Sequence, residues 1–433
     1  MKNSKKLVID SFFIGAALFS MYFGAGNMIF PPYLGLEAGT SWFSGFLGYY
    51  IADIGLAVVA ILALIRVGGQ KNLMDLLGKG VGRIMLFAIV MCIGPIISIP
   101  RTAATTYELS IAPLASGFNM PLFYLLFFLL TLLLCIKKSA VVDIVGKILT
   151  PVLFLGLLLL IIKGLITPMG DIIESPRSDS VIANGIEAGY QSMDVLASVI
   201  FGVLILNSAT EKGHTDKGSQ ARVATGAGLV AGAGLLVIYL GLTYLGASAT
   251  AHYDMHITRT ELLTGIIDTL LPGSFGLIFF AVVAGMACIS TSVALTSSAA
   301  EYLESISRGK ISYKHYVIII CIFGAVASMV GVEGLISLAA PILSVVYPPV
   351  LVLVLLSFLG KWLGVLPIRF AAFTAMAFGL VDALAAFGIT VPYVWTLPLA
   401  SFGLAWVFPS LFMLVIGAVI QRILTNKMKK FKN

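Results

Sequence analysis

A run of glycines, an asparagine and prolines interrupts the first long apolar stretch of the chain. Gly24, Gly26 and Asn27 are followed by Pro31 and Pro32, and both glycine and proline weaken a helix. Non-helical backbone inside a membrane occurs only where it is buried in protein or lines a watery cavity. The freed N–H and C=O groups of such a break can hold a carboxylate, an ammonium group or a sodium ion. The two glycines also suit close helix packing, but their spacing before Asn and two prolines favours a break, which is typical of a small-solute carrier.

A second interruption falls in the sixth apolar stretch, where Gly189 is followed by Gln191, Ser192 and Asp194. Interruptions at corresponding places in two halves of a chain are the best sequence pointer to a transporter site. The positive end of a half-helix faces whatever lies at such a break, so the backbone amides of residues 24–27 suit a carboxylate. We therefore expect two broken helices that share one site.

Adjacent hydroxyl groups in the eighth apolar stretch form a candidate cation site. Ser290 and Thr291 lie side by side in a run with several more serines and threonines. Hydroxyl groups and backbone carbonyls are the oxygen ligands that a small hard cation needs. Hydroxyls in membrane helices also bond back to carbonyls of their own helix or across a helix contact, so residue type alone leaves both roles open.

Several charged residues lie within or near apolar stretches, and charges inside a membrane are costly and mark functional sites. They are Asp53, Arg101, Glu108, Asp194 and Asp382. Arg101 is expected to face a cavity and to pair with Glu108 or Asp194, although a long side chain can also reach the membrane surface. Asp53 and Asp382 have a simpler interpretation as partners in polar contacts between helices. No nucleophile constellation stands out, so we expect neither an enzyme nor a bound cofactor.

The composition supplies the elements that must position these residues. Of the 433 residues, 59% are hydrophobic and only 11% are charged, whereas soluble domains are about 25% charged, so the chain is expected to be an all-α integral membrane protein. A span needs about 20 apolar residues. On that rule the chain has twelve spans in one polytopic domain, at about 8–31, 41–65, 84–110, 120–136, 141–163, 187–208, 221–248, 274–300, 315–331, 334–358, 368–388 and 397–421.

The net charge of +7 is explained by topology rather than by nucleic-acid binding. If the N-terminus is cytoplasmic and the twelve spans alternate, all but four of the 27 lysines and arginines fall on the cytoplasmic side. The four exceptions are Arg101, Lys163, Arg177 and Arg259. Positive residues gather on that side of membrane proteins, which predicts cytoplasmic N- and C-termini. A nucleic-acid interface would instead gather the basic residues on one face.

Three motifs resemble the branched-chain amino acid:cation symporter family over essentially the whole chain. They are FGAGNMIFPP at 23–32, IPRTA at 99–103 and GYQSMD at 189–194. The resemblance implies the amino acid–polyamine–cation superfamily fold, a 5+5 inverted repeat with discontinuous helices 1 and 6 and two additional C-terminal helices. The repeats then cover about 8–163 and 187–358, and the last two helices about 368–421.

The resemblance also assigns the site residue by residue. For the amino acid it implies Gly24, Ala25, Gly26, Asn27, Ser192, Met193 and Asp194, to which we add Arg101 as a cavity residue. For sodium it implies Ser20, Phe23, Ala287, Ser290 and Thr291. The sixth span departs from the glycine-rich break of the superfamily.

The function implied is sodium-coupled import of leucine, isoleucine and valine across the cell membrane by alternating access. An apolar pocket favours the branched side chains at about 0.8 kcal/mol for each buried CH₂ group. The alternative is a proton-coupled carrier of apolar amino acids, in which Asp194, Asp53 or Asp382 titrates. Membrane lipid is the only other partner expected, with no nucleic acid and no obligate protein partner.

Overall fold

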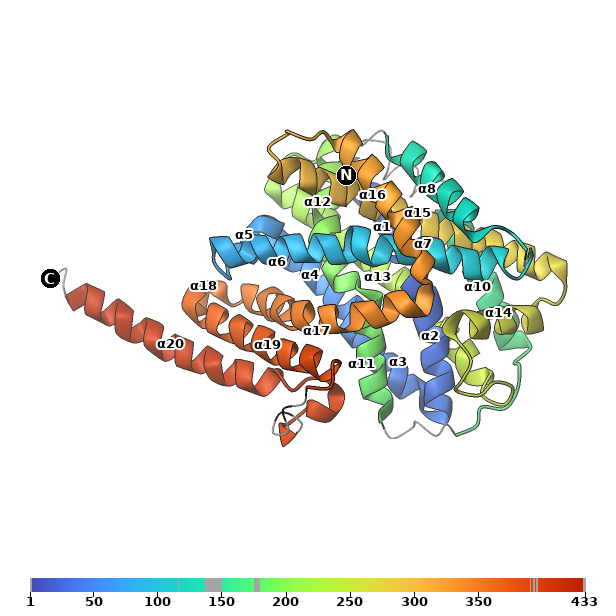
Figure 1. Ribbon diagram of the computed structural model, residues 1–433. Coiled ribbons are helices and arrows are strands. Elements are labelled where there is room, and N and C mark those ends of the chain that lie inside the picture. The colour runs from blue at the N-terminus through green and yellow to red at the C-terminus, as the bar shows by residue number, and fades with distance from the viewer. Residues whose placement is uncertain are drawn as a thin grey trace.

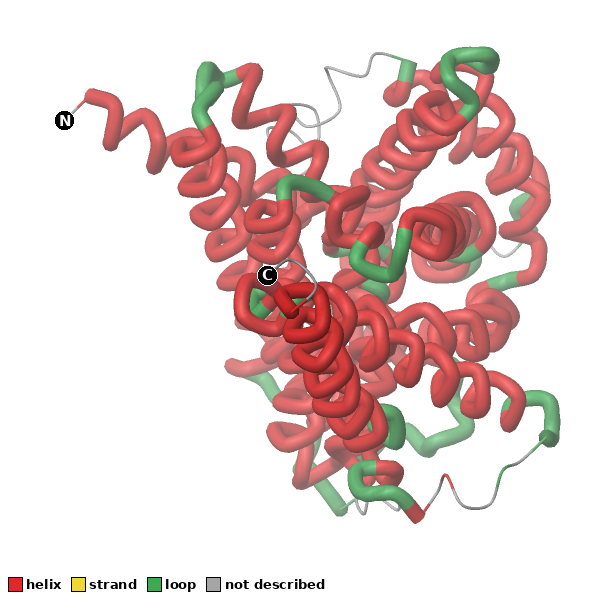
Figure 2. The backbone as a smooth tube through the Cα atoms, turned by 90° about the vertical axis from the view of Figure 1, so that its left-hand side faces the viewer, coloured by secondary structure: helices red, strands yellow, loops and turns green. Residues whose placement is uncertain are grey.

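The computed structural model of the protein describes residues 2–430 apart from 116, 137–149, 175–179, 390, 392–393 and 395. These described residues form helices joined by loops and contain no strand, as Figure 1 and Figure 2 show. The predicted all-α class is therefore confirmed for this part of the chain. Outside it lie the first residues of the predicted 141–163 span and five of the basic residues used for the topology, namely Lys137, Lys138, Lys147, Arg177 and Lys432.

The first predicted span consists of two helices, α1 (Lys2–Tyr22) and α2 (Ala25–Ala38), which are separated by only two residues. The break is shorter than the sequence indicated, because α2 continues through Pro31 and Pro32. Proline has no N–H, so the carbonyls four residues earlier, including that of Asn27, lose their helical partner without the helix ending.

The sixth predicted span is also two helices, α11 (Val181–Ser192) and α12 (Asp194–Glu211). Only Met193 separates them, in a left-handed conformation with φ 70° that is uncommon for a residue other than glycine. The predicted interruption from Gly189 to Asp194 is therefore too long, since the residues before Met193 complete the last turn of α11.

The helices between the two breaks are segmented by tighter or wider turns. The second span is α3 (Trp42–Tyr50), the π-helical turn η2 (Ile51–Gly55) and α4 (Leu56–Val67), and it is preceded by η1 (Gly39–Ser41) and followed by α5 (Gln70–Asp75). The third is α6 (Lys79–Met91), η3 (Cys92–Ile96), α7 (Ser98–Thr106) and η4 (Tyr107–Ile111), and then come α8 (Met120–Cys135) and α10 (Thr150–Ile166). A kink in the third span falls at Gly94, directly before Pro95.

The second half of the chain contains the longest helices. They are α13 (Lys217–Ser248), α14 (Arg259–Leu270), α15 (Ser274–Ile306), α16 (Tyr313–Ala327), η8 (Ser328–Val330) and α17 (Val332–Ser357). After them come α18 (Gly360–Leu363), α19 (Val365–Ala385), η10 (Ala400–Phe402) and α20 (Val407–Lys430). The last predicted span begins too early, because residues 397–406 form turns and η10 before α20 starts.

Nine helical segments of the described residues are long and apolar enough to cross a membrane, and α8 and α10 are shorter apolar helices. The protein is therefore a multi-pass membrane protein. In Figure 1, α19 and α20 lie at one edge of the molecule, where α19 packs on α17 and α20 packs on α19.

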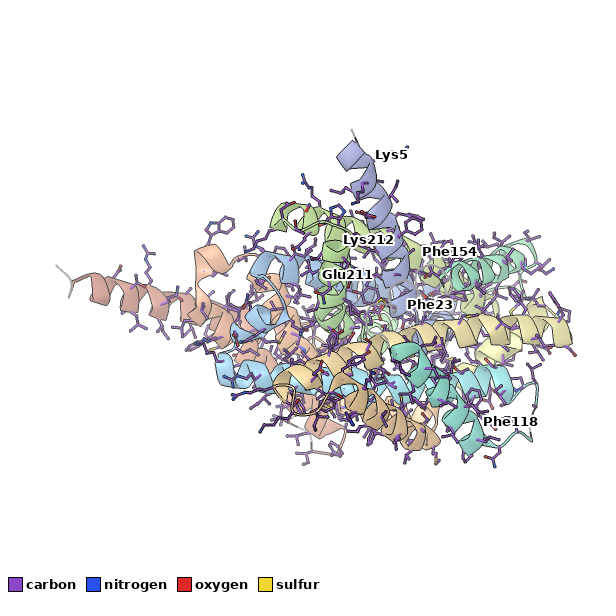
Figure 3. All side chains as sticks on the ribbon, turned by 90° about the horizontal axis from the view of Figure 1, so that it is seen from above. Lys5, Phe23, Phe118, Phe154, Glu211 and Lys212 are labelled. Atoms are coloured by element: carbon purple, nitrogen blue, oxygen red, sulfur yellow. The ribbon has the colours of Figure 1, made fainter. Side chains whose placement is uncertain are left out.

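The two broken helices occupy the centre of the bundle. Helices α1 and α2 pack against α13, whereas α11 packs against α3 and α12 against α4. Figure 3 shows Lys5 at the free end of α1 and Phe23 at its inner end, and Phe23 is fully buried. A close contact fixes α2 on α13, since a Cβ atom on Gly246 would lie 1.8 Å from the carbonyl oxygen of Pro32.

Candidate substrate and cation site

A small cavity lies between the two helix breaks. It is lined by all the residues that the sequence analysis assigned to the amino acid, namely Gly24, Ala25, Gly26, Asn27, Arg101, Ser192, Met193 and Asp194, and by Thr291 of the assigned sodium ligands. Its apolar lining includes Ile93, Ala197, Phe201 and Leu295. Residues more than 160 positions apart in the sequence therefore meet at one place.

The two glycines of the first break permit close approach of neighbouring side chains. A Cβ atom on Gly24 would lie 2.8 Å from Oγ1 of Thr291, and one on Gly26 would lie 2.8 Å from Nη2 of Arg101. Real Cβ atoms do not come so close to other atoms. The absence of a side chain at these positions thus lets α7 and α15 approach the start of α2.

Asp194 connects the second break to the first. It occupies the first turn of α12 and is almost fully buried. Nδ2 of Asn27 donates a hydrogen bond to Oδ2 of Asp194 at 2.8 Å, and the Tyr239 hydroxyl donates to the same oxygen at 3.3 Å. Asn27 also contacts the Tyr239 hydroxyl. Donors from α2 and α13 therefore hold this carboxyl group at the cavity wall.

Arg101 lies inside the protein rather than reaching towards the membrane surface. Its side chain is buried, and Nη1 donates to the backbone oxygen of Gln191 at 2.9 Å, at the end of α11. Its guanidinium carbon lies 5.6 Å from the ring centre of Phe30. Neither expected ion pair of Arg101, with Glu108 or with Asp194, is present among the described residues. Arg101 therefore lines the cavity, and its predicted pairing is wrong.

The hydroxyl pair of α15 contacts backbone oxygens of α1 just before the break. Oγ of Ser290 donates to the Ser20 oxygen at 2.7 Å and to the Ala287 oxygen at 2.8 Å. Oγ1 of Thr291 donates to the oxygen of Met21 at 3.0 Å. Ser290 thus makes both contacts that the sequence left open, one within its helix and one across to α1.

These oxygens are of the chemical kind that a sodium ion takes as ligands. Three of the five assigned residues, Ser20, Ala287 and Ser290, are joined by the two hydrogen bonds of the Ser290 hydroxyl, and Phe23 lies in the adjacent break. Carbonyl and hydroxyl oxygens are the donors that hard cations prefer. Met21 was missed by the sequence analysis, because only the contact with Thr291 distinguishes its carbonyl from the others in α1.

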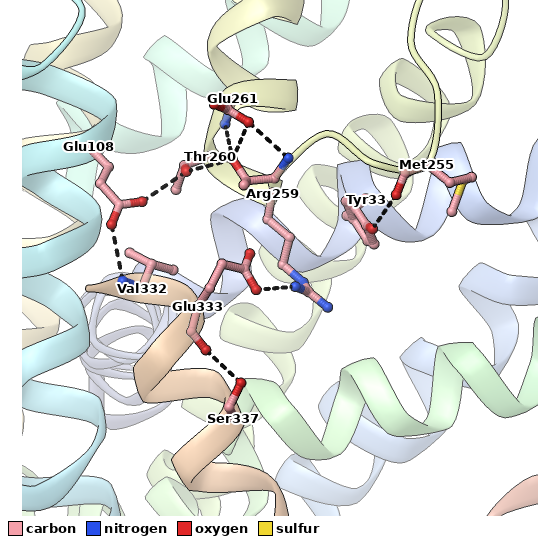
Figure 4. Close-up of polar contacts among 10 residues, drawn as sticks. Tyr33, Glu108, Met255, Arg259, Thr260, Glu261, Val332, Glu333 and Ser337 are labelled. Atoms are coloured by element: carbon pink, nitrogen blue, oxygen red, sulfur yellow. Dashed lines mark hydrogen bonds and ion pairs between the residues drawn. The ribbon is translucent and has the colours of Figure 1, made fainter. Parts of the chain in front are cut away.

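A polar network at the start of α14 lies beyond the cavity (Figure 4). Glu108 accepts hydrogen bonds from the Thr260 hydroxyl at 2.9 Å and from the backbone N–H of Val332 at 3.1 Å. Nη1 of Arg259 pairs with Oε2 of Glu333 at 2.7 Å. These contacts, which we call the α14 network, join α14 to η4 and to the start of α17. They also give Glu108 the partners that it was expected to find in Arg101.

Arg259 extends this network towards the cavity. Its guanidinium carbon lies 4.6 Å from the ring centre of Tyr33 and 5.6 Å from that of Phe30, the ring that Arg101 also faces. Such cation–π contacts favour a cation over the ring face. Only the folded chain reveals the role of Phe30, because its two arginine partners come from distant helices.

The first turn of α14 is stabilised by a reciprocal cap. The Thr258 hydroxyl accepts a hydrogen bond from the backbone N–H of Glu261, and the Glu261 carboxylate accepts one from the N–H of Thr258. Hydrogen bonds from the Thr258 hydroxyl and N–H hold the pKa of Glu261 below its ordinary value, since they favour the ionised form. The cap fixes the position of Arg259, the first residue of the helix.

Comparison with known proteins identifies the family to which the chain is similar. Residues 7–424 match the model of a family described as branched-chain amino acid transport protein. The chain is 34% identical to the branched-chain amino acid permease BraB of Bacillus subtilis, covering 98% of this chain and 97% of that protein. It is also 34% identical to the branched-chain amino acid transport system 3 carrier protein of Pseudomonas aeruginosa, over 96% and 97% of the two chains.

The fold has solved counterparts. The closed, bromovinylhydantoin-bound structure of Mhp1, a nucleobase-cation-symport-1 family transporter, aligns with a TM-score of 0.57 at 15% identity and covers 96% of this chain and 93% of that one. At this identity the likeness concerns the fold alone. With a family match over nearly its whole length, the chain belongs to the branched-chain amino acid transport protein family, whose members are transporters and not enzymes.

Proposed function

We propose that the protein imports leucine, isoleucine and valine across the cell membrane by sodium-coupled alternating access. The observation that carries this proposal is the cavity between the two helix breaks, which has Asp194 and Arg101 in its wall and the Ser290–Thr291 pair beside it. The names of the relatives support the choice of branched-chain amino acids as substrates.

The start of α2 suits the carboxylate of the substrate. The first N–H groups of a helix have no partner within the helix, and the helix dipole favours an anion there. Ala25, Gly26 and Asn27 are the first residues of α2 and line the cavity. The ammonium group then lies near the Asp194 carboxylate and the free carbonyls of the breaks, while Phe201 and Leu295 face the branched side chain.

Sodium binds in this proposal between α1 and α15. The carbonyls of Ser20, Phe23 and Ala287 and the hydroxyls of Ser290 and Thr291 supply the oxygens, and the contacts that Ser290 and Thr291 make with α1 support this assignment. Sodium binding links the first break to α15, so the ion stabilises the arrangement that also holds the substrate. This linkage provides the coupling.

The proposed architecture has twelve spans in a single domain, with repeats at about 8–163 and 187–358 and two further helices at about 368–421. Each broken helix packs on the second span of the other half. The first pair, α1 and α2, packs on α13, whereas α11 and α12 pack on α3 and α4. Two inverted halves would produce this arrangement. The distribution of lysine and arginine supports cytoplasmic N- and C-termini.

Uptake of radiolabelled leucine into proteoliposomes tests the proposal, with sodium and proton gradients imposed separately. We expect accumulation with an inward sodium gradient at equal pH on both sides. Accumulation that follows a pH gradient and ignores sodium would instead establish the alternative, a proton-coupled carrier of apolar amino acids. Uptake that never saturates would point to a channel.

A further inference from the structure

Asp53 is a buried carboxyl group that the proposed sodium and substrate sites leave unexplained. It lies in the middle of η2, the π-helical turn between α3 and α4, and has no exposed surface. Neither of its carboxyl oxygens has a hydrogen-bond partner among the described residues. A single π-helical turn inside an α-helix is uncommon and often marks a functional site, and a buried polar group without a partner requires a physical reason.

The surroundings of Asp53 contain further unpaired oxygens. The hydroxyl groups of Tyr49 and Tyr347 are buried and likewise lack a partner within the described part of the chain, and both side chains interact with Asp53. The turn packs directly on the second break, since a Cβ atom on Gly189 would lie 3.3 Å from the backbone nitrogen of Asp53. Ser192 and Asp194, on either side of that break, also interact with Asp53.

The described groups around Asp53 supply no positive charge. The titratable groups that interact with it from the neighbouring helices are Tyr22 of α1, Tyr49 of α3, Asp194 of α12, Tyr239 of α13 and Tyr347 of α17. Its contact from α11 is the neutral Ser192, and the one charged side chain of α4, Arg66, is bonded at the far end of that helix to the backbone oxygen of Phe358. An ionised Asp53 would therefore lie beside a second carboxyl group with no cation to balance it.

The two carboxyl groups differ in their hydrogen bonds. Asp194 accepts bonds from Asn27 and Tyr239, and Arg101 acts on it across the cavity. No donor among the described residues reaches Asp53 in good hydrogen-bond geometry, although Ser192, Tyr49 and the backbone of Asp194 lie close to its carboxyl group. Two carboxyl groups that share a site do not both ionise, and the one that receives donors keeps the charge. The difference in donors favours the negative charge on Asp194 and the proton on Asp53.

We propose that Asp53 is a proton-binding site of the transport cycle, additional to the sodium site. The proton adds to one carboxyl oxygen of Asp53 when the break between α11 and α12 excludes water, and it returns to water from the same oxygen when that break becomes hydrated. No other bond forms or breaks. This inference rests on the proposed carrier function, because the cycle that hydrates the break is the transport cycle.

Infrared difference spectroscopy tests the bound proton without requiring transport. The C=O stretch of a protonated carboxyl group is separate from the bands of a carboxylate, so the purified wild-type protein minus Asp53→Asn should show this band at neutral pH. Asp382→Asn is the matched control, because Asp382 is another acid in the helical bundle, placed in a different cavity beside α17 and α19. Loss of the band in the control but not in Asp53→Asn would overturn the proposal.

Transport measurements test whether the proton on Asp53 moves during leucine transport. Asn matches protonated Asp in size and charge, so Asp53→Asn proteoliposomes should still exchange leucine and still accumulate it with a sodium gradient. Leucine-driven proton movement, followed with a pH-sensitive dye inside the vesicles, should be present in wild type and in Asp382→Asn and absent in Asp53→Asn. Proton movement that persists in Asp53→Asn, or a sodium dependence that disappears there, would refute the proton site.

A second variant covers the case in which Asp53→Asn does not insert into the membrane. Tyr49→Phe removes a hydroxyl group beside Asp53 and leaves the carboxyl group in place. Loss of this polar neighbour disfavours the ionised form of Asp53. The pH at which leucine exchange falls by half should therefore shift towards alkaline values. An unchanged pH profile would contradict the proposal. Absence of sodium-driven uptake in wild type would refute the sodium assignment while the infrared band still decides the role of Asp53.

Discussion

Asn27 donates a hydrogen bond of 2.8 Å to the carboxyl group of Asp194, and this contact joins the two helix breaks of the protein. The donor lies on α2, just after the first break, and the acceptor lies on the first residue of α12, just after the second. Any change of cavity shape that separates the two breaks must lengthen this bond. The length of this hydrogen bond therefore depends on the distance between the two helix breaks.

Removing the charge of Asp194 should weaken leucine binding at every pH. Hydrogen bonds to charged groups contribute about 1.5–3 kcal/mol, so Asp194→Asn should raise the leucine dissociation constant by roughly 10- to 150-fold. Leucine binding to purified protein at several pH values is the measurement. Retained leucine exchange together with loss of sodium-driven uptake would show that Asp194 itself accepts a coupling ion.

Deleting both hydroxyls of α15 should weaken activation by sodium. Hydroxyl bonds in a helix contact average only about 0.6 kcal/mol in membranes, so a packing role would give the double variant Ser290→Ala, Thr291→Ala a small effect. We expect a much larger increase in the sodium concentration needed for half-maximal uptake. Ser298→Ala is the control, because this buried hydroxyl of the same helix bonds back to the Ala294 oxygen. Equal sodium curves for both variants would leave the pair a packing role.

A methyl group at Gly26 should abolish uptake while leaving the protein in the membrane. The added Cβ atom would lie 2.8 Å from Nη2 of Arg101, so the guanidinium group must leave its place at the cavity. Gly285→Ala is a matched control, because no atom of the described residues lies within 4 Å of the corresponding Cβ position. Normal leucine uptake by Gly26→Ala would contradict a tightly fixed site at the first break.

Neutralising the Arg259–Glu333 pair should loosen the α14 network. Exposed ion pairs contribute about 0–1 kcal/mol, and this pair is partly exposed, so Glu333→Gln should change leucine affinity by less than about fivefold. Labelling of a cysteine introduced at Asn184, which lines a cavity together with Arg259 and Gln191, should become faster. Slower or unchanged labelling would show that the pair does not restrict access to this cavity, and the charge swap Arg259→Glu, Glu333→Arg should restore the original rate.

The sequence located the two helix breaks that line the cavity but not their contacts. Glycine spacing and polar residues inside apolar runs indicated the two breaks, because a membrane helix breaks only where its backbone is buried in protein or lines a cavity. The individual residues 24–27 and 192–194 followed from the resemblance to the family. Tyr239 and Phe30 were missed, since an aromatic residue in an apolar helix gives no signal until its partner from another helix is known. The Arg101–Glu108 pairing failed because seven helical residues span roughly 10 Å along the axis, which places the two side chains at different depths.

The lengths of the two breaks were also overestimated, for a local reason. Propensity rules count each glycine or proline as a separate weak point. In the folded protein α2 passes through Pro31 and Pro32 because neighbouring helices support it, and one left-handed residue, Met193, is enough to redirect the chain. Tertiary packing thus concentrates each break into one or two residues.

The contact between Gly246 and Pro32 restricts how the protein can move. With no side chain at Gly246, the backbones of α13 and α2 touch, and neither helix can slide along the other without a clash. We therefore expect these two helices to move as one rigid body. A motion that exposes the cavity would then occur at contacts made by side chains, such as the Arg259–Glu333 pair between α14 and α17. Such contacts can separate and re-form without disturbing a backbone.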